Sequence, residues 1–237
     1  MNRFYKILTV IMLSGFISGS AFAFNGFSIG VLGSSSDFDT KGSETEGAGD
    51  KETNYGEISK SVDYGAGFIE YTIGSGNTGA GGFALTVGAE YIPGAASLGT
   101  KSRTDVTVDG NEANQDDNTY TAKAEVENAR TFYLEPTFTF TDNLGFYVKG
   151  GITQVDVTSL EDIASGTDSS VYGDETIDGM MYGVGLRGQL ANGIGVKIEY
   201  VAVEYDEVKL TSTTGNLNVI KATPKEKSTR IGLYYNF

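Results

Sequence analysis

Apolar and polar residues alternate along several short stretches of this chain, and the clearest stretch is its last nine residues. One face of this stretch is apolar and aromatic, with Ile231, Leu233, Tyr235 and Phe237, while Arg230 lies on the opposite face. A period of two predicts a β-strand whose two faces meet different surroundings. The closing strand of a membrane barrel has this pattern, because its outer face meets lipid and its inner face meets a polar lumen.

The same alternation predicts eight strands. They cover residues 24–35, 61–73, 83–91, 131–140, 146–153, 180–190, 194–201 and 229–237. Short turns and long polar segments strictly alternate between these strands. The long segments are residues 36–59, the segment that follows Pro93, residues 156–178 and residues 204–227.

An even number of strands, with short turns at one end and long loops at the other, is typical of bacterial outer-membrane barrels. The sequence therefore predicts an all-β fold, an eight-stranded antiparallel up-and-down transmembrane β-barrel with four long extracellular loops. Weak alternation at residues 104–108 and 119–126 predicts that the third and fourth strands extend beyond the membrane. A soluble secreted β-protein is the alternative.

The N-terminus has the features of a secretory signal peptide, which we expect to cover residues 1–23. Arg3 and Lys6 precede an apolar run over residues 7–17, and Ala21-Phe22-Ala23 forms a cleavage motif. The barrel is then expected over residues 24–237, exported to the cell outer membrane of a Gram-negative-type cell.

The composition of the chain disfavours several classes of function. The chain has no Cys and no His and a formal net charge of -14. Such a charge disfavours binding to nucleic acid, and the missing imidazole removes the commonest general base and metal ligand. We therefore expect no enzymatic activity, no catalytic residues, no metal and no cofactor.

A G-x-G-x-x-G motif at residues 183–188 lies inside an alternating strand and opens no helix, so it does not predict nucleotide binding. The acidic segment 156–178 could hold a divalent cation or an unknown surface ligand, although a solvated loop is the simpler interpretation.

The inward face of the predicted strands carries four acids and four bases. They are Glu70, Glu90, Glu135, Glu199, Lys149, Arg187, Lys197 and Arg230. The interior of an eight-stranded barrel is just wide enough for side chains to fill it, and charges buried there must be paired. The sequence therefore predicts a lumen closed by ion pairs. The alternative is a narrow polar path for ions or small solutes, favoured by inward glycines. These are Gly88, Gly151, Gly183, Gly185, Gly195 and Gly232.

Several segments resemble the small eight-stranded outer-membrane barrels, the family of the OmpA transmembrane domain, OmpX and the opacity-type porins. They are Ala21-Phe22-Ala23, Tyr133-Leu134-Glu135-Pro136, residues 143–151, Gly183-Val184-Gly185 and residues 231–237. The resemblance implies a barrel in contact with outer-membrane lipid and lipopolysaccharide.

The resemblance also implies insertion by the barrel assembly machinery, which would read the aromatic C-terminal strand with Ile231, Leu233, Tyr235 and Phe237. It further implies an ion-pair network in the lumen that favours Glu135, Lys149, Arg187 and Arg230. The chain stops at the barrel, so we expect no peptidoglycan-binding domain and a bare barrel like OmpX. The expected function is that of a non-enzymatic outer-membrane protein with a structural or surface-interaction role, and a small porin-like channel is the alternative.

Overall fold

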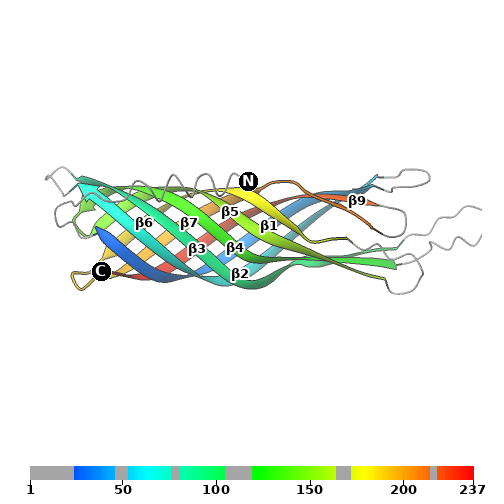
Figure 1. The fold of residues 1–237 in the computed structure, drawn as a ribbon, viewed down its shortest axis with the longest axis horizontal. Coiled ribbons are helices and arrows are strands. Elements are labelled where there is room, and N and C mark those ends of the chain that lie inside the picture. The colour runs from blue at the N-terminus through cyan, green and yellow to red at the C-terminus, as the bar shows by residue number, and fades with distance from the viewer. Residues whose placement is uncertain (1–23, 46–52, 76–80, 105–118, 164–171, 214–217) are drawn as a thin grey trace, which may run out of the picture.

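The computed structural model describes residues 24–45, 53–75, 81–104, 119–163, 172–213 and 218–237. The expected signal peptide, residues 1–23, lies outside these ranges. All regular elements of the described residues are strands (Figure 1). They are β1 Gly26–Thr45, β2 Thr53–Ser75, β3 Gly82–Thr104, β4 Thr119–Thr141, β5 Leu144–Ile163, β6 Glu175–Gln189, β7 Ile194–Tyr205, β8 Val208–Thr211 and β9 Val219–Asn236. Within the described ranges, no helix is long and apolar enough to span a membrane.

Consecutive strands pair antiparallel, and the sheet closes on itself because β9 also pairs with β1. The short strand β8 continues the position of β7 in the wall, since both pair with β9 at different heights. The wall therefore has eight positions, which confirms the predicted eight-stranded antiparallel up-and-down barrel. The C-terminus and the start of β1 lie at the same end, where Ser28 pairs with Asn236.

The strands are longer than the sequence pattern predicts. β2, β3 and β4 each have 23 residues, whereas about 9–11 residues suffice to cross a bilayer. The expected loop over residues 36–59 is largely wrong, because β1 continues to Thr45 and β2 begins at Thr53. Polar side chains support this extension, for example where Ser61 donates a hydrogen bond of 2.6 Å to Asp37.

The other expected loops need the same correction. β5 runs to Ile163 and β6 begins at Glu175, so strand replaces much of the segment 156–178. β8 and the first half of β9 occupy much of the segment 204–227. The predicted extension of the fourth strand is present from Thr119, and the third strand reaches Thr104. The rest of the extension predicted over residues 104–108 lies outside the described ranges. A strand can continue after its outward apolar alternation ends, because backbone hydrogen bonds continue the ladder and inward apolar residues such as Val157 and Val203 pack inside the barrel.

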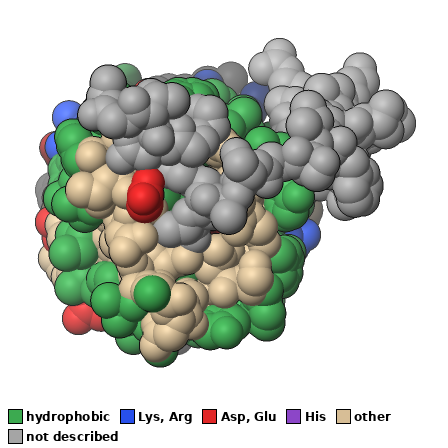
Figure 2. Space-filling view, turned by 90° about the vertical axis from the view of Figure 1, so that its left-hand side faces the viewer, with side chains coloured by type: hydrophobic (Ala, Val, Ile, Leu, Met, Phe, Trp, Pro, Cys, Tyr) green, Lys and Arg blue, Asp and Glu red, His purple; other side chains and the backbone are tan. Residues whose placement is uncertain are grey.

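An apolar band surrounds the half of the barrel nearest the short turns. Exposed residues on eight strands contribute to it, including Ile29, Ile69, Leu85, Phe138, Val148, Leu186, Ile198 and Leu233. Viewed from the turn end, hydrophobic side chains form much of the outer rim, while polar and backbone atoms fill the visible middle (Figure 2). An apolar surface of this extent matches lipid rather than water, so the barrel is transmembrane.

Candidate functional site

Strand alternation carries the eight predicted charged residues into the lumen. Each of them is at most 4% exposed. They project from seven strands: Glu70 from β2, Glu90 from β3, Glu135 from β4, Lys149 from β5, Arg187 from β6, Lys197 and Glu199 from β7, and Arg230 from β9. The structure therefore brings all eight together in one buried cluster.

The part of this cluster nearer the short turns joins two acids to two bases. Lys197 Nζ donates to both Glu135 oxygens at 2.7 and 2.8 Å, and it also donates to Glu70 Oε1. Arg187 lies 3.4 Å from Glu70 and 3.8 Å from Glu135, and it donates to Thr86 Oγ1 at 3.0 Å. Each carboxylate here faces two cations, an arrangement that offsets part of the cost of removing the charges from water.

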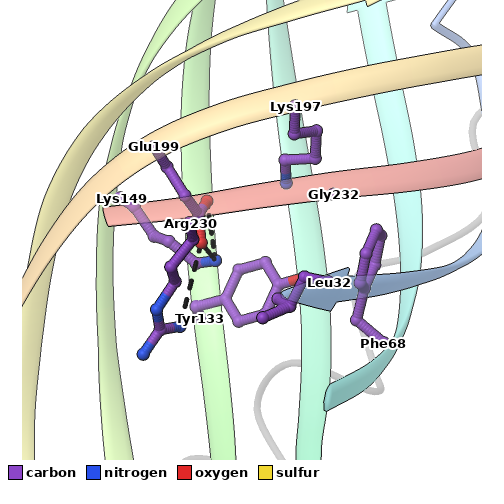
Figure 3. Close-up of a pocket in the computed structure, with 8 residues that line it drawn as sticks. All are labelled: Leu32, Phe68, Tyr133, Lys149, Lys197, Glu199, Arg230 and Gly232. Carbon is purple, nitrogen blue, oxygen red and sulfur yellow. Dashed lines mark hydrogen bonds and ion pairs between the residues drawn. The ribbon is translucent and has the colours of Figure 1, made fainter. Parts of the chain in front are cut away.

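The remaining charges continue the network toward the other end of the barrel. Lys149 donates to both oxygens of Glu199 at 3.1 Å and lies 3.4 Å from Glu135, which connects the two parts. Arg230 donates to Glu90 at 2.9 Å. It also lies 3.8 Å from Glu199, a contact drawn in Figure 3. The network therefore crosses the lumen as one connected chain of ion pairs.

Tyrosine rings fill the space around these charges. Tyr133 donates to Glu70 at 2.9 Å, and Tyr147 donates to Glu199 at 2.8 Å. The Tyr133 ring lies 3.9 Å from Lys149 Nζ, a cation–π contact. A Cβ added to Gly88 or Gly185 would overlap the Tyr133 or Tyr147 ring, respectively. These inward glycines make room for aromatic rings and leave little free space.

A fifth buried acid, Glu226 on β9, joins the network, and the sequence prediction missed it. Glu226 accepts hydrogen bonds from Tyr64 at 2.6 Å and from Tyr205 at 3.1 Å. Arg230 lies 3.7 Å from Glu226 and donates to the Tyr64 hydroxyl at 2.7 Å. The segment 204–227 was expected to be a loop, although Glu226 shares its strand parity with Arg230. With five acids and four bases, the cluster has a formal charge of −1.

Beyond the charged cluster, toward the long-loop end, the interior becomes apolar. We call this region the apolar layer. It consists of Phe38, Leu98, Val155, Val157, Tyr172, Ile177, Met181, Val201, Val203, Tyr205, Val208 and Leu210. Its members are all less than 9% exposed. The lumen is thus filled in two successive layers, one charged and one apolar.

The free space beside the ion pairs is small. A cavity of about 10 Å³ lies between Leu32, Phe68, Tyr133, Lys149, Lys197, Glu199, Arg230 and Gly232 (Figure 3). This volume corresponds to about one water molecule. The ion pairs and the surrounding rings therefore leave little free space at this cavity.

Two described acids of the segment 156–178 already have partners. Asp156 accepts from Arg130 at 2.8 Å and from Thr176 at 2.9 Å, and Asp178 accepts from Gln154 at 2.9 Å. Residues 164–171 lie outside the described ranges. Within those ranges, no group of three or more acidic side chains is placed to hold a metal ion.

Three residues of the expected assembly signal lie on the outer face of β9, and the fourth, Phe237, follows the end of the strand. Ile231, Leu233, Tyr235 and Phe237 are 58%, 56%, 44% and 72% exposed. The Phe237 ring packs 5.0 Å from Tyr235 and 6.0 Å from Phe27 on β1. The C-terminal aromatic residue therefore lies across the seam where β9 meets β1.

No protein-family model and no curated protein matches the chain. Several solved structures do match. One is Ail, the attachment invasion locus protein of Yersinia pestis, in complex with the heparin analogue sucrose octasulfate. Its sequence identity to this chain is 10% and its TM-score is 0.32, and the match covers 87% of this chain and 99% of that chain. The outer membrane protease OmpT from Escherichia coli is 12% identical with a TM-score of 0.46, covering 93% and 99%. Neisserial surface protein A is 10% identical with a TM-score of 0.36, covering 90% and 98%. Sequence identities and TM-scores this low support no inference about activity or ligands.

Proposed function

We propose that this protein is an integral protein of the cell outer membrane with a closed barrel and a structural or surface-interaction role. The outer-membrane location is supported by the lipid-matched band, the closed antiparallel wall and the signal-like N-terminus. The long strands support a role at the surface, because they extend well past the length that a bilayer crossing requires.

The observation that carries the closed barrel is the succession of two filled layers in the lumen. A solute would first have to separate ion pairs whose members are nearly fully buried, such as Lys197 and Glu135. It would then have to enter the apolar layer, where an ion loses its hydration at a cost of several kcal/mol. The two layers oppose permeation by different physics, so a polar solute and an apolar solute each meet one barrier.

A porin-like channel is the alternative, and the inward glycines were its main support. The ring of Tyr234 occupies the space beside Gly195, and the Val201 side chain lies beside Gly183. These contacts favour the closed barrel. The absence of His from the whole sequence supports a function without acid–base catalysis.

Single-channel recording tests this proposal. Refolded protein is inserted into planar bilayers, and insertion is checked separately by a heat-modifiable shift on an electrophoresis gel. We expect inserted protein to give no stable open level, and a sizeable, long-lived conductance would overturn the closed barrel. Fractionation of expressing cells tests the location, and recovery of folded monomer in the soluble fraction would contradict it.

A further inference from the structure

The wall of the barrel contains one incomplete seam, between β2 and β3. These strands pair only from Gly67–Tyr91 to Ser75–Phe83. Toward the long-loop end, β2 continues to Thr53 and β3 continues to Thr104, and the described residues of the two strands form no further pairs. β2 remains paired with β1 and β3 remains paired with β4 over these extensions.

The sequence of β3 explains why the two strands part. Pro93 follows the last pair closely and has no N–H to donate to a ladder. Gly94 has a φ of 92°, a conformation that favours glycine, and the β3–β4 register shifts between Ile92 and Ala95. A second shift lies between Ser97 and Gly99. These irregularities turn β3 away from β2 and interrupt its own edge.

The edge of β2, in contrast, is regular. Its register with β1 runs without a shift from Gly26–Thr72 to Thr45–Thr53. We call residues 53–66 the β2 edge. Native proteins usually interrupt or cover a long regular edge, because its backbone groups are ready to pair with another strand.

Alternation identifies the backbone groups that face the open seam. The Phe27 carbonyl accepts from Phe237 of β9, so odd-numbered residues of β1 direct their backbone groups to β9. Even-numbered residues of β1 therefore face β2, and their partners on β2, such as Glu70 for Ser28, are also even. Consequently the odd residues of the β2 edge direct N–H and C=O groups into the seam.

The outward side chains of the β2 edge include two acids and no base. Glu57 and Asp63 are both exposed. On the neighbouring strands the charges are mixed: Lys41 of β1 lies 3.5 Å from Glu57, and Asp37 and Asp39 of β1 stand opposite Lys227 and Lys225 of β9. Lys60 is also exposed, but it is even-numbered and belongs to the opposite face. A strand added to this edge would therefore place its outward residues next to carboxylates, which favours Lys or Arg at alternate positions.

A second copy of the chain fits this edge poorly. Two barrels in one membrane are related by an axis along the membrane normal, so two β2 edges would run parallel. Near-equivalent residues would then face each other, with Glu57 close to Glu57 and Asp63 close to Asp63. Like charges opposite one another destabilise a strand pair, so the edge favours a different, cationic partner.

From this edge and its charge we propose that residues 53–66 bind an extended, cationic segment of a partner protein by adding it to the sheet as a further strand. Backbone hydrogen bonds supply affinity in this mode, and alternate side chains supply specificity. The proposal deepens the surface-interaction role and rests on it. It requires only the exposed edge, so its test is independent of whether the lumen conducts.

The test uses refolded full-length protein in detergent micelles and a synthetic peptide as long as the edge in which Lys and Thr alternate. Amide hydrogen exchange is followed by NMR. In the free protein the odd amides of the β2 edge, such as Ser59 and Ser61, exchange rapidly, while even amides such as Val62 are protected. The peptide slows the odd amides by at least about tenfold and leaves the even amides unchanged.

Three results would overturn the proposal. The odd amides could already be protected in the free protein, the peptide could fail to bind, or it could bind without selective protection of odd amides. A peptide of the same composition with its Lys residues grouped at one end serves as a control for simple charge attraction. We expect this control peptide to leave the exchange rates of both odd and even amides as they are in the free protein.

Variants separate edge pairing from charge alone. Ser61→Pro removes one N–H that faces the seam and leaves the β1 backbone ladder intact, but it also removes the exposed hydrogen bond from Ser61 to Asp37. We therefore expect about tenfold weaker peptide binding with a loss of unfolding free energy of no more than about 1 kcal/mol. Exchanging both outward acids, Glu57→Lys with Asp63→Lys, should transfer binding to a peptide that alternates Glu and Thr. The matched control is Asp142→Lys in the short turn at the opposite end, which should bind the Lys–Thr peptide like the parent protein. Unchanged binding to Ser61→Pro, or no transfer of specificity, would contradict strand addition.

Discussion

Replacing Arg230 with Ala tests the ion-pair network most directly. The guanidinium is 1% exposed and reaches Glu90 at 2.9 Å, Glu226 at 3.7 Å and the Tyr64 hydroxyl at 2.7 Å. Removing the guanidinium leaves both buried carboxylates without their nearest cation. Glu90 keeps Lys149 at 3.8 Å, whereas Lys149 makes no contact with Glu226. Breaking a buried pair by deleting one partner costs about 3–5 kcal/mol. We expect Arg230→Ala to lose about this much unfolding free energy.

The measurement is urea unfolding of the refolded barrel in lipid vesicles. The chain has no Trp, so tyrosine fluorescence and the heat-modifiable gel band report the folded fraction. The matched control is Arg130→Ala, because Arg130 also pairs with a carboxylate, at 2.8 Å, but its side chain is 45% exposed. An exposed pair contributes about 0–1 kcal/mol. Adding Glu226→Gln to Arg230→Ala should recover part of the loss, about 1–3 kcal/mol, because it removes the carboxylate left unpaired. Equal, small losses for Arg230→Ala and Arg130→Ala would refute the network as a stabilising element.

Three further predictions concern other parts of the barrel. Deleting Phe237 should lower the yield of assembled barrel in cells more than it lowers the unfolding free energy of the assembled protein; the reverse ordering would contradict an assembly role. Gly195→Val should destabilise the barrel by about 1–3 kcal/mol in urea unfolding because it meets a tyrosine ring, whereas Gly67→Val should cost little because a Cβ there has no neighbour within 4 Å. Met181→Ala in the apolar layer should cost about 2–5 kcal/mol, and the adjacent, 60% exposed Met180 should tolerate the same change. Equal effects within either pair would refute the assignment of inner and outer faces.

The period of two was enough to predict the number of strands and the direction of the charged side chains. Lys197 and Glu199, for example, are separated by Ile198, and the structure places the two charges inside and the apolar residue outside. Side-chain direction follows from local geometry, so the sequence alone determines it once the strand is recognised. The ion-pair partners of each charged side chain cannot be predicted in this way, because they depend on the stagger between strands that are distant in the sequence.

Glu226 illustrates a loss of signal at the membrane boundary. It lies four residues before Arg230 on the same face of β9, but the residues between them are polar. Apolar alternation was taken as the sign of a strand, so a strand that continues into water was assigned to a loop. The incomplete β2–β3 seam was equally hidden, since Pro93 and Gly94 indicate an interruption but not which neighbour is lost.

The phase of the alternation itself marks where the membrane ends. Along β7, Ile198 and Tyr200 face outward, and beyond them Val201 and Val203 face inward while Glu204 faces outward. The direction of each residue still alternates, but the apolar class moves from the outer face to the inner face. A strand in lipid needs an apolar outside, and a strand in water needs an apolar inside, so this exchange locates the boundary. On β7 the exchange falls directly beyond the exposed Tyr200, and aromatic side chains concentrate at membrane surfaces for reasons independent of the lumen. Two separate physical requirements thus place the boundary at the same residue, which is how an apolar layer can lie above a charged one in a single barrel.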